Sequence, residues 1–109
     1  MEVRWLPFAQ KQLKVVVQYV VDNFGEMTAK KSLKTILSKV EALSTCPDRG
    51  VWDKKFSTSE VRVRHLNIGP NVVYYLIDRD EVVVIAVMHY RQSPMTINRT
   101  IRYVLDNYV

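Results

Sequence analysis

The feature that most constrains the fold of this sequence is an almost continuously apolar run over Val82–His89. Valine, the commonest residue of the run, favours β-strands because its branched side chain packs well on a pleated surface. A strand that is apolar on both faces is usually covered on both faces, which happens inside a sheet and not at its edge. The run is therefore predicted to be the central strand of the fold.

Three other segments have strand character. Glu60–Leu66 alternates apolar and polar residues, and Val72–Asp78 is strongly β-forming. Turn-forming residues at 69–71 and 78–81 separate these runs from each other and from the central strand, which predicts an antiparallel meander of three strands. Near the N-terminus, Val3 to Trp5 follows the same alternation and predicts a short first strand.

The segment between the first strand and the meander has helical periodicity. Apolar residues recur at helical spacing over 9–24, and Gly25 is expected to end that helix. A second apolar stripe covers 33–43, with Thr28 as its expected N-terminal cap and Ser44–Pro47 as its end. Two amphipathic helices joined by about three residues predict an antiparallel helical hairpin.

These elements predict an α+β fold in two layers, with a two-helix antiparallel hairpin packed on a small antiparallel β-sheet. The order is β-α-α-β-β-β, followed by a C-terminal segment. The segment 48–59 is expected to be a loop, with Trp52 and Phe56 as anchors. At 109 residues the chain suits a single domain over 1–109, in which 96–109 is a short helical tail.

Composition narrows the class of protein. The single cysteine, Cys46, cannot form an internal disulfide, which argues against a disulfide-stapled secreted domain. The N-terminus has no apolar run of signal-peptide length, and no stretch reaches the roughly 18 apolar residues of a membrane span. We therefore expect a cytoplasmic protein without a membrane partner. The net charge of +5 favours polyanions or an acidic protein as partners.

No metal or cofactor motif is present in the sequence. Two histidines and one cysteine lie in different segments and make no ligand set by their spacing. No glycine-rich phosphate loop is found either, so we expect neither a metal nor a cofactor.

The candidate chemistry lies in Arg64, His89, Tyr90 and Arg91. In a meander, the C-terminal end of the last strand lies near the start of the middle strand and the end of the first. Arg64, His89 and Arg91 are therefore expected to converge on one edge of the sheet. Such a cluster suits RNA cleavage without a metal, in which His89 acts as base or acid, the arginines stabilise charge on phosphorus, and Tyr90 stacks on a base or shares in proton transfer.

A purely structural role for these residues stays open. His89 could cap a buried strand, while Arg64 and Arg91 pair with Asp78 or Asp80. Three other residues are expected in the core: His65, by its strand parity with the neighbouring valines, and Tyr74 and Tyr75, with hydroxyls at the rim of the core.

The order of several motifs resembles the RelE/ParE superfamily of toxins, also called plasmid stabilisation proteins. The strongest part comprises Val63-Arg64-His65-Leu66, then Val72-Val73-Tyr74-Tyr75, and finally Met88-His89-Tyr90-Arg91-Gln92. The resemblance covers about residues 3 to 94. It implies the toxin component of a type II toxin–antitoxin system, which inhibits growth and is neutralised by a cognate antitoxin protein. The positions that carry over are Arg64, His89 and Arg91.

The resemblance leaves the target open. RelE-like members are mRNA interferases, endoribonucleases that cleave mRNA in the ribosome, and the residues slightly favour this activity. ParE-like members poison DNA gyrase and need no nuclease site. A third possibility is an inactive member that acts only as a binding module.

Overall fold

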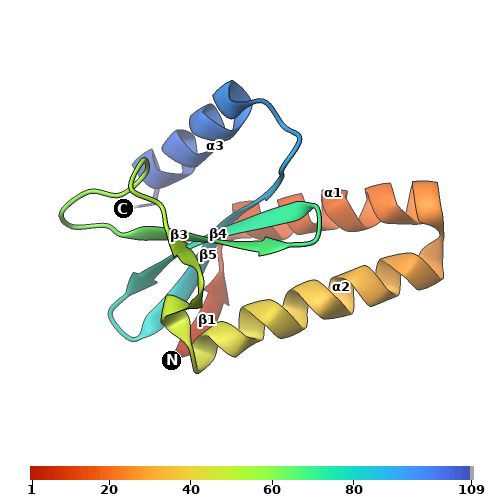
Figure 1. Cartoon of the computed structure of the whole chain (residues 1–109), viewed down its shortest axis with the longest axis horizontal. Coiled ribbons are helices and arrows are strands. Elements are labelled where there is room, and N and C mark those ends of the chain that lie inside the picture. Colours follow the sequence, from red (N-terminus) through yellow and green to blue (C-terminus); the bar gives the residue numbers. More distant parts are fainter. Residues whose placement is uncertain (109) are drawn as a thin grey trace.

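The structure is a computed structural model that describes residues 1–108, and it consists of one five-stranded sheet with helices on both faces (Figure 1). The strands lie in the order β1-β5-β4-β3-β2. Their bounds are β1 (Glu2–Trp5), β2 (Val51–Trp52), β3 (Val63–Ile68), β4 (Asn71–Asp78) and β5 (Glu81–His89). The helices are α1 (Pro7–Phe24), α2 (Glu26–Glu41) and α3 (Pro94–Asp106), with short 3-10 turns η1 (Ala42–Ser44) and η2 (Pro47–Arg49).

The apolar run forms the central strand, as predicted. Every residue of β5 from Val82 to Met88 is buried. Strand β4 pairs with it antiparallel, from Asn71↔His89 to Asp78↔Glu81. On its other side β5 pairs with β1 in parallel, from Glu2↔Glu81 to Trp5↔Val84. The sheet is therefore mixed, and the expectation of a purely antiparallel sheet is wrong for β1.

The helical hairpin covers one face of the sheet. Ala9 of α1 and Ile36 and Val40 of α2 are buried against Val73 and Val84 of the central strands. Beyond the four residues of β1, the edge of β5 meets α1, where the Gln12 side-chain oxygen accepts a 2.7 Å hydrogen bond from the Val87 backbone N–H. The side chain of Gln12 thus continues the edge pairing where β1 has ended.

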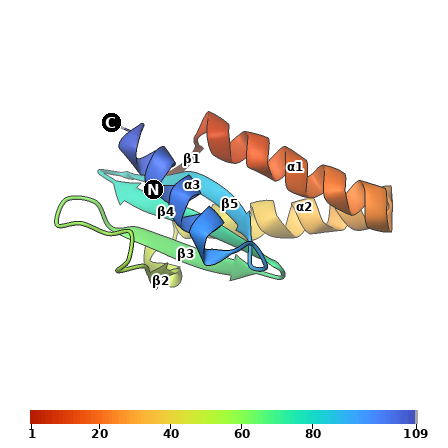
Figure 2. The same cartoon turned by 90° about the horizontal axis from the view of Figure 1, so that it is seen from above.

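Helix α3 covers the opposite face, so the fold has three layers and not the two predicted (Figure 2). Its buried residues Ile101 and Val104 pack with Val63, Phe56 and other residues of that face. The C-terminal segment is helical, as expected, and begins at Pro94. Its apolar side belongs to the chain's own core.

The hairpin turn is tighter than predicted. Gly25 alone joins α1 to α2, with φ of 91°, in place of the expected link of about three residues. Thr28 therefore lies inside α2 and does not cap it. The hairpin extends well past the sheet (Figure 1), which leaves Phe24 and Met27 exposed near its tip.

The segment 48–62 also differs from expectation. Val51 and Trp52 form a two-residue strand paired with β3, where a loop was predicted. Strand β3 begins at Val63 and not at Glu60, because the Thr58 hydroxyl accepts hydrogen bonds from the backbone N–H groups of Glu60 and Val61 and closes a local turn. Phe56 is buried, as expected of an anchor, but Trp52 is exposed, so the expectation that it also anchors the segment is wrong.

None of the helices described within residues 1–108 is both long enough and apolar enough to cross a membrane.

Candidate functional site

Three of the four predicted site residues form one cluster at the end of β5. The rings of His89 and Tyr90 are stacked, with centroids 5.0 Å apart. The guanidinium of Arg91 lies 5.5 Å from the Tyr90 ring centre, and its Nε donates a 2.9 Å hydrogen bond to the Tyr90 hydroxyl. The Arg91 backbone N–H donates to His89 Nδ1 at 3.0 Å, which leaves Nε2 as the protonated nitrogen of the neutral ring. All of these contacts come from consecutive residues.

A tight turn holds the cluster in place. The side-chain oxygen of Gln92 accepts from the His89 backbone N–H at 2.7 Å, and the Gln92 backbone N–H donates to the His89 carbonyl at 3.0 Å. Tyr90 donates its N–H to the carbonyl of Pro70 in the β3–β4 turn. The cluster is therefore fixed to the sheet, while the Tyr90 ring stays exposed.

Arg64 does not lie beside this cluster, contrary to the expected convergence. It faces Tyr75 in the β3–β4 register, whereas His89 faces Asn71, which in turn faces Ile68. Arg64 and Ile68 are four residues apart on β3, so Arg64 lies about 13 Å farther along the sheet, at roughly 3.3 Å per residue. The register determined by the two turns decides this separation, and strand parity alone could not reveal it.

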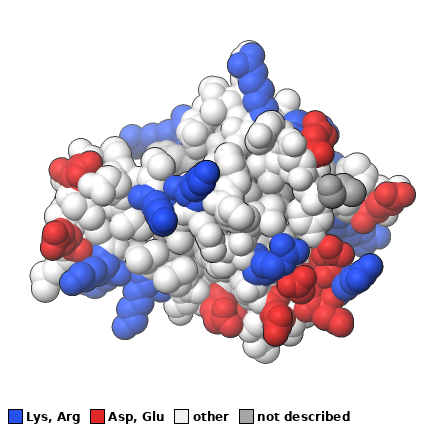
Figure 3. Space-filling view, turned by 180° about the vertical axis from the view of Figure 1, so that it is seen from behind, with Lys and Arg blue, Asp and Glu red and all other residues white. Residues whose placement is uncertain are grey.

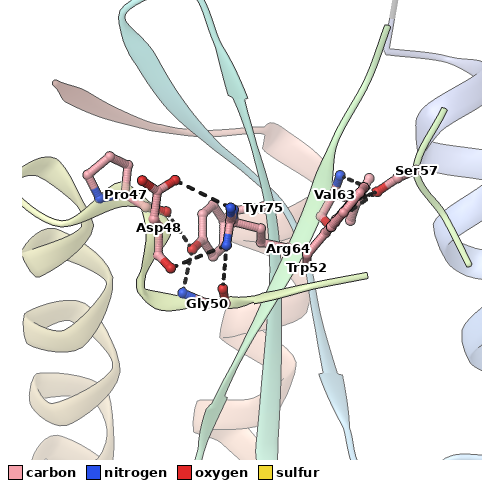
Figure 4. Close-up of polar contacts among 8 residues, drawn as sticks. All are labelled: Pro47, Asp48, Gly50, Trp52, Ser57, Val63, Arg64 and Tyr75. Carbon is pink, nitrogen blue, oxygen red and sulfur yellow. Dashed lines mark hydrogen bonds and ion pairs between the residues drawn. The ribbon is translucent and has the colours of Figure 1, made fainter. Parts of the chain in front are cut away.

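Arg64 instead holds the segment that precedes β2 (Figure 4). Its guanidinium donates to the backbone carbonyls of Gly50, at 2.8 Å, and Asp48, at 3.2 Å, and lies 3.4 Å from the Asp48 carboxylate. The hypothesis that Arg64 pairs with Asp78 or Asp80 is therefore wrong, because its carboxylate partner is Asp48. The structural role itself fits, because the guanidinium has protein acceptors on several sides.

Tyr75 binds the same segment through its hydroxyl. Its side chain is fully buried, as expected, and its hydroxyl donates to the Pro47 carbonyl at 2.7 Å and accepts from the Gly50 N–H at 2.8 Å. Burial raises the pKa of the Tyr75 hydroxyl, and the hydrogen bond from Gly50 opposes that shift. We call Pro47, Asp48, Gly50, Arg64 and Tyr75 the η2 latch. Sequence pattern does not reveal the latch, because Arg64 and Tyr75 reach residues 47–50 only through tertiary contacts.

His65 and Tyr74 are structural on the α3 face. Tyr74 is buried and packs edge-on against Phe56, with ring centroids 5.9 Å apart. Burial raises the pKa of Tyr74, and the nearby Asp53 carboxylate adds to the shift. His65 Nδ1 lies 3.2 Å from the same carboxylate. Tyr74 serves the packing expected of it, whereas His65 is half-buried at the rim of the core and pairs with Asp53, so the expectation of a core histidine is wrong. Neither residue is placed as an exposed platform for a base.

An apolar groove lies beside the His89 cluster. It has a volume of about 520 Å³ and runs between the outer side of α1, the β3–β4 turn and the end of β5. Val15, Tyr19 and Phe24 form its α1 side and are strongly exposed, at 70%, 58% and 64%. His89 and Gln92 lie at its polar end. The sequence held part of the signal for this groove, since Val15 and Tyr19 are apolar residues outside the stripe predicted for α1. Phe24 was predicted to lie on that stripe, but it is exposed.

The site offers one imidazole, one phenol and one guanidinium next to an apolar surface. These groups could move a proton and stabilise one negative charge. Within residues 1–108, no group of three or more His, Cys, Asp or Glu side chains is placed to hold a metal ion. The apolar wall suits a protein segment better than a sugar–phosphate chain, because its burial releases water from apolar side chains.

A family model described as the ParE toxin of the type II toxin–antitoxin system parDE matches residues 3–94. The chain belongs to this ParE toxin family. The match stops where α3 begins, so α3 lies almost wholly outside the family region of this ParE-family chain.

A solved structure supports the fold. The chain resembles a chain of the chromosomal ParDE TA system from P. aeruginosa, with a TM-score of 0.67 and 19% sequence identity. The similarity covers 82% of this chain and 95% of that one. No protein with a curated description matches the sequence. The resemblance to the RelE/ParE superfamily is thus confirmed.

Proposed function

We propose that this ParE-family toxin arrests growth by binding a protein target and not by cleaving RNA. The observation that carries the proposal is the apolar groove along α1, where Val15, Tyr19 and Phe24 are exposed together. Exposed apolar patches of this kind mark protein-binding surfaces. The target we infer is DNA gyrase, which the resemblance to ParE-like members implies.

The partner that neutralises the toxin is a cognate antitoxin protein, in keeping with its family and with the ParDE system of its structural neighbour. We propose that the antitoxin also uses the groove, since covering Tyr19 and Phe24 would hide the surface that reaches the target. An antitoxin would thereby inhibit by competition. The cytoplasm is the compartment where both gyrase and antitoxin are found, and we propose it as the location of this chain.

A second candidate function rests on the β5 cluster. His89, Tyr90 and Arg91 supply an acid–base group, a stacking ring and a cation within one turn. Metal-independent mRNA cleavage on the ribosome therefore stays a proposal for this chain. It is the weaker one, because Arg64, the other cation it calls for, is engaged in the η2 latch.

Induced expression in a bacterium, with pulse-labelling of DNA and protein synthesis over the first minutes, separates the candidates. We expect DNA synthesis to stop first, and we expect Tyr19→Ser to relieve the arrest at equal protein level. His89→Ala is the matched variant at the other end of the groove and should leave most toxicity intact. An early stop in protein synthesis that His89→Ala or Arg91→Ala abolishes would replace gyrase poisoning with mRNA cleavage. Normal growth with the wild-type chain would indicate an inactive family member that acts as a binding module.

A further inference from the structure

We propose that the loop between β2 and β3, together with the adjoining side of α3, binds single-stranded nucleic acid. This goes beyond the proposed function, because it concerns a different surface and does not depend on gyrase or on an antitoxin. The surface is defined by Trp52, Lys54, Lys55, Arg62 and Arg102, and we call it the Trp52 surface. It lies at a distance along the sheet from the His89 cluster, since Trp52 pairs with Arg64 and not with the Ile68 end of β3.

The centre of the surface is an exposed tryptophan flanked by cations. Trp52 is 45% exposed, and both the Lys54 ammonium and the Arg62 guanidinium lie 5.5 Å from its ring centroid. A cation over the face of an aromatic ring is attracted by the ring's negative face, so the ring holds both charges near one place. The stacked guanidinium keeps hydrogen-bond donors that can reach a phosphate.

A second pair of cations lies over the buried Phe56. The Lys55 ammonium and the Arg102 guanidinium are each 5.5 Å from the Phe56 ring centroid. Arg102 of α3 also donates a 3.0 Å hydrogen bond to the Lys55 carbonyl. This contact ties the loop to α3 and brings a cation from the last helix to those of the loop.

The loop is held in one conformation by its own hydrogen bonds (Figure 4). The hydroxyl of Ser57 accepts from the Trp52 indole N–H at 3.0 Å and from the Val63 N–H at 2.9 Å, and donates to the Asp53 carbonyl at 2.6 Å. On one flank the η2 latch fixes the chain before Trp52. On the other flank Phe56 is buried. A surface that is already ordered loses little entropy when a ligand binds.

The positive charge of the surface is not neutralised by neighbouring carboxylates. The ion pairs formed within residues 1–108 are Arg4–Glu81, Arg64–Asp48 and His65–Asp53, and none includes a cation of this surface. Asp53 is largely buried against His65, which leaves Glu60 as the exposed carboxylate of the loop. Several acidic side chains gather in one region of the molecule, as Figure 3 shows from behind. The register brings four of them together where β1, β4 and β5 meet, namely Glu2, Asp78, Asp80 and Glu81.

Cations interleaved with an exposed aromatic ring are typical of surfaces that bind single-stranded nucleic acid. The cations contact phosphates, and an unpaired base stacks on the exposed part of the Trp52 ring or on the Arg62 guanidinium plane. An acidic peptide would use the same cations but would gain nothing from the indole face. A duplex would offer phosphates but no free base. The exposed tryptophan therefore favours an unpaired strand, of DNA or of RNA.

The test is binding of fluorescently labelled oligo-dT and oligo-U of about 12 nucleotides to the whole purified chain, followed by anisotropy as salt is raised. We expect both oligomers to bind at low salt and a matched duplex to bind more weakly. Trp52→Ala should weaken binding about 5- to 160-fold, the range for the loss of one stacked base, while Trp52→Phe retains most of it. Lys54→Gln with Arg62→Gln should lower the slope of log affinity against log salt by about 1.4, at roughly 0.7 per phosphate contact.

The matched control removes the same charge elsewhere, through Lys30→Gln with Lys34→Gln on exposed α2 positions. Equal losses in this control would mean that only net charge attracts the strand, and would overturn the proposal. So would wild-type binding that Trp52→Ala leaves unchanged, a duplex that binds as tightly as the single strands, or a poly-glutamate peptide that competes as well as they do. Tighter binding of oligo-dT or of oligo-U shows whether the surface prefers single-stranded DNA or RNA. Circular dichroism of each variant confirms its fold, and the growth assay is scored separately.

Discussion

At the scale of single residues, Arg64 and Tyr75 each form hydrogen bonds to backbone groups, and these bonds hold the segment before β2 in place. The sequence predicts Arg64 as a catalytic cation, because a meander was expected to bring it to the same edge of the sheet as His89 and Arg91. In the structure its guanidinium donates to the carbonyls of Asp48 and Gly50, in the same segment whose Pro47 carbonyl accepts from the Tyr75 hydroxyl. The side-chain hydrogen bonds among His89, Tyr90 and Arg91, by contrast, join consecutive residues and leave the Tyr90 ring exposed. The acceptors of the two arginines therefore distinguish their roles. Arg64 is bound to the backbone and is structural, whereas Arg91 donates to the exposed Tyr90 and stays a candidate for chemistry.

The glycine of the η2 latch gives a prediction at this scale. A Cβ on Gly50 would lie 2.5 Å from the Tyr75 hydroxyl oxygen and 2.8 Å from the His65 carbonyl oxygen, so Gly50→Ala must displace the latch. We expect a loss of about 2 kcal/mol in the free energy of unfolding, which corresponds to roughly 10 °C in Tm. Gly69→Asn is the control, since no atom lies within 4 Å of its Cβ position and its φ of +58° suits asparagine. Equal melting curves for Gly50→Ala and the wild type would show that the latch is not rigid.

At the scale of elements, sequence periodicity predicted the helices and strands whose apolar pattern is local. The central strand β5, the β3 and β4 runs, the two helices of the hairpin and the helical tail were all foreseen, with boundaries shifted by a few residues. The parallel pairing of β1 and the two-residue strand β2 were not, because both depend on partners far along the chain, Glu81–Val84 and Arg64–His65. The same limit applies to the site. His89, Tyr90 and Arg91 are neighbours in sequence and meet in space, whereas the position of Arg64 relative to them depends on register.

The attachment of α3 to the sheet gives a pH-dependent prediction. Tyr108, just after α3, donates a 2.6 Å hydrogen bond to the carboxylate of Asp78 in β4. Burial is the main cause that raises the pKa of the Tyr108 hydroxyl, and this hydrogen bond is the second. Because the pKa is higher in the folded state, stability present below about pH 10 is lost as pH rises through the folded pKa. At pH 7.5 we expect Tyr108→Phe to cost about 1 kcal/mol of unfolding free energy. The difference from wild type should shrink at pH 10.5.

Urea denaturation at the two pH values measures this effect. Tyr103→Phe, an exposed tyrosine of the same helix, is the control and should change little at either pH. A Tyr108→Phe deficit of the same size at both pH values would mean that the hydroxyl stabilises α3 by packing and not through its bond to Asp78.

At the scale of the whole molecule, the sheet joins the first strand of the chain to its last strand. Glu2 pairs with Glu81, and the N-terminal ammonium donates to the Ser44 carbonyl at 2.9 Å. The buried side of the helical hairpin packs against residues of β3, β4 and β5, which follow it in the sequence. The hairpin extends past the sheet, which leaves Phe24 exposed on the groove that we propose for target and antitoxin.

This dependence predicts that the hairpin does not fold by itself. Ala9 is the fully buried residue of α1, and α2 buries Ala29, Ile36 and Val40, with sheet residues forming much of their surroundings. Isolated helices of this length are marginal in water, and their stability in proteins comes mostly from packing of the apolar face. A peptide of residues 7–44 should therefore show less than about half the helix signal at 222 nm that the same residues contribute in the full chain. A fully helical, cooperatively melting peptide would contradict this and would make the hairpin an independent unit, whose exposed Tyr19 and Phe24 could then engage a partner without the sheet.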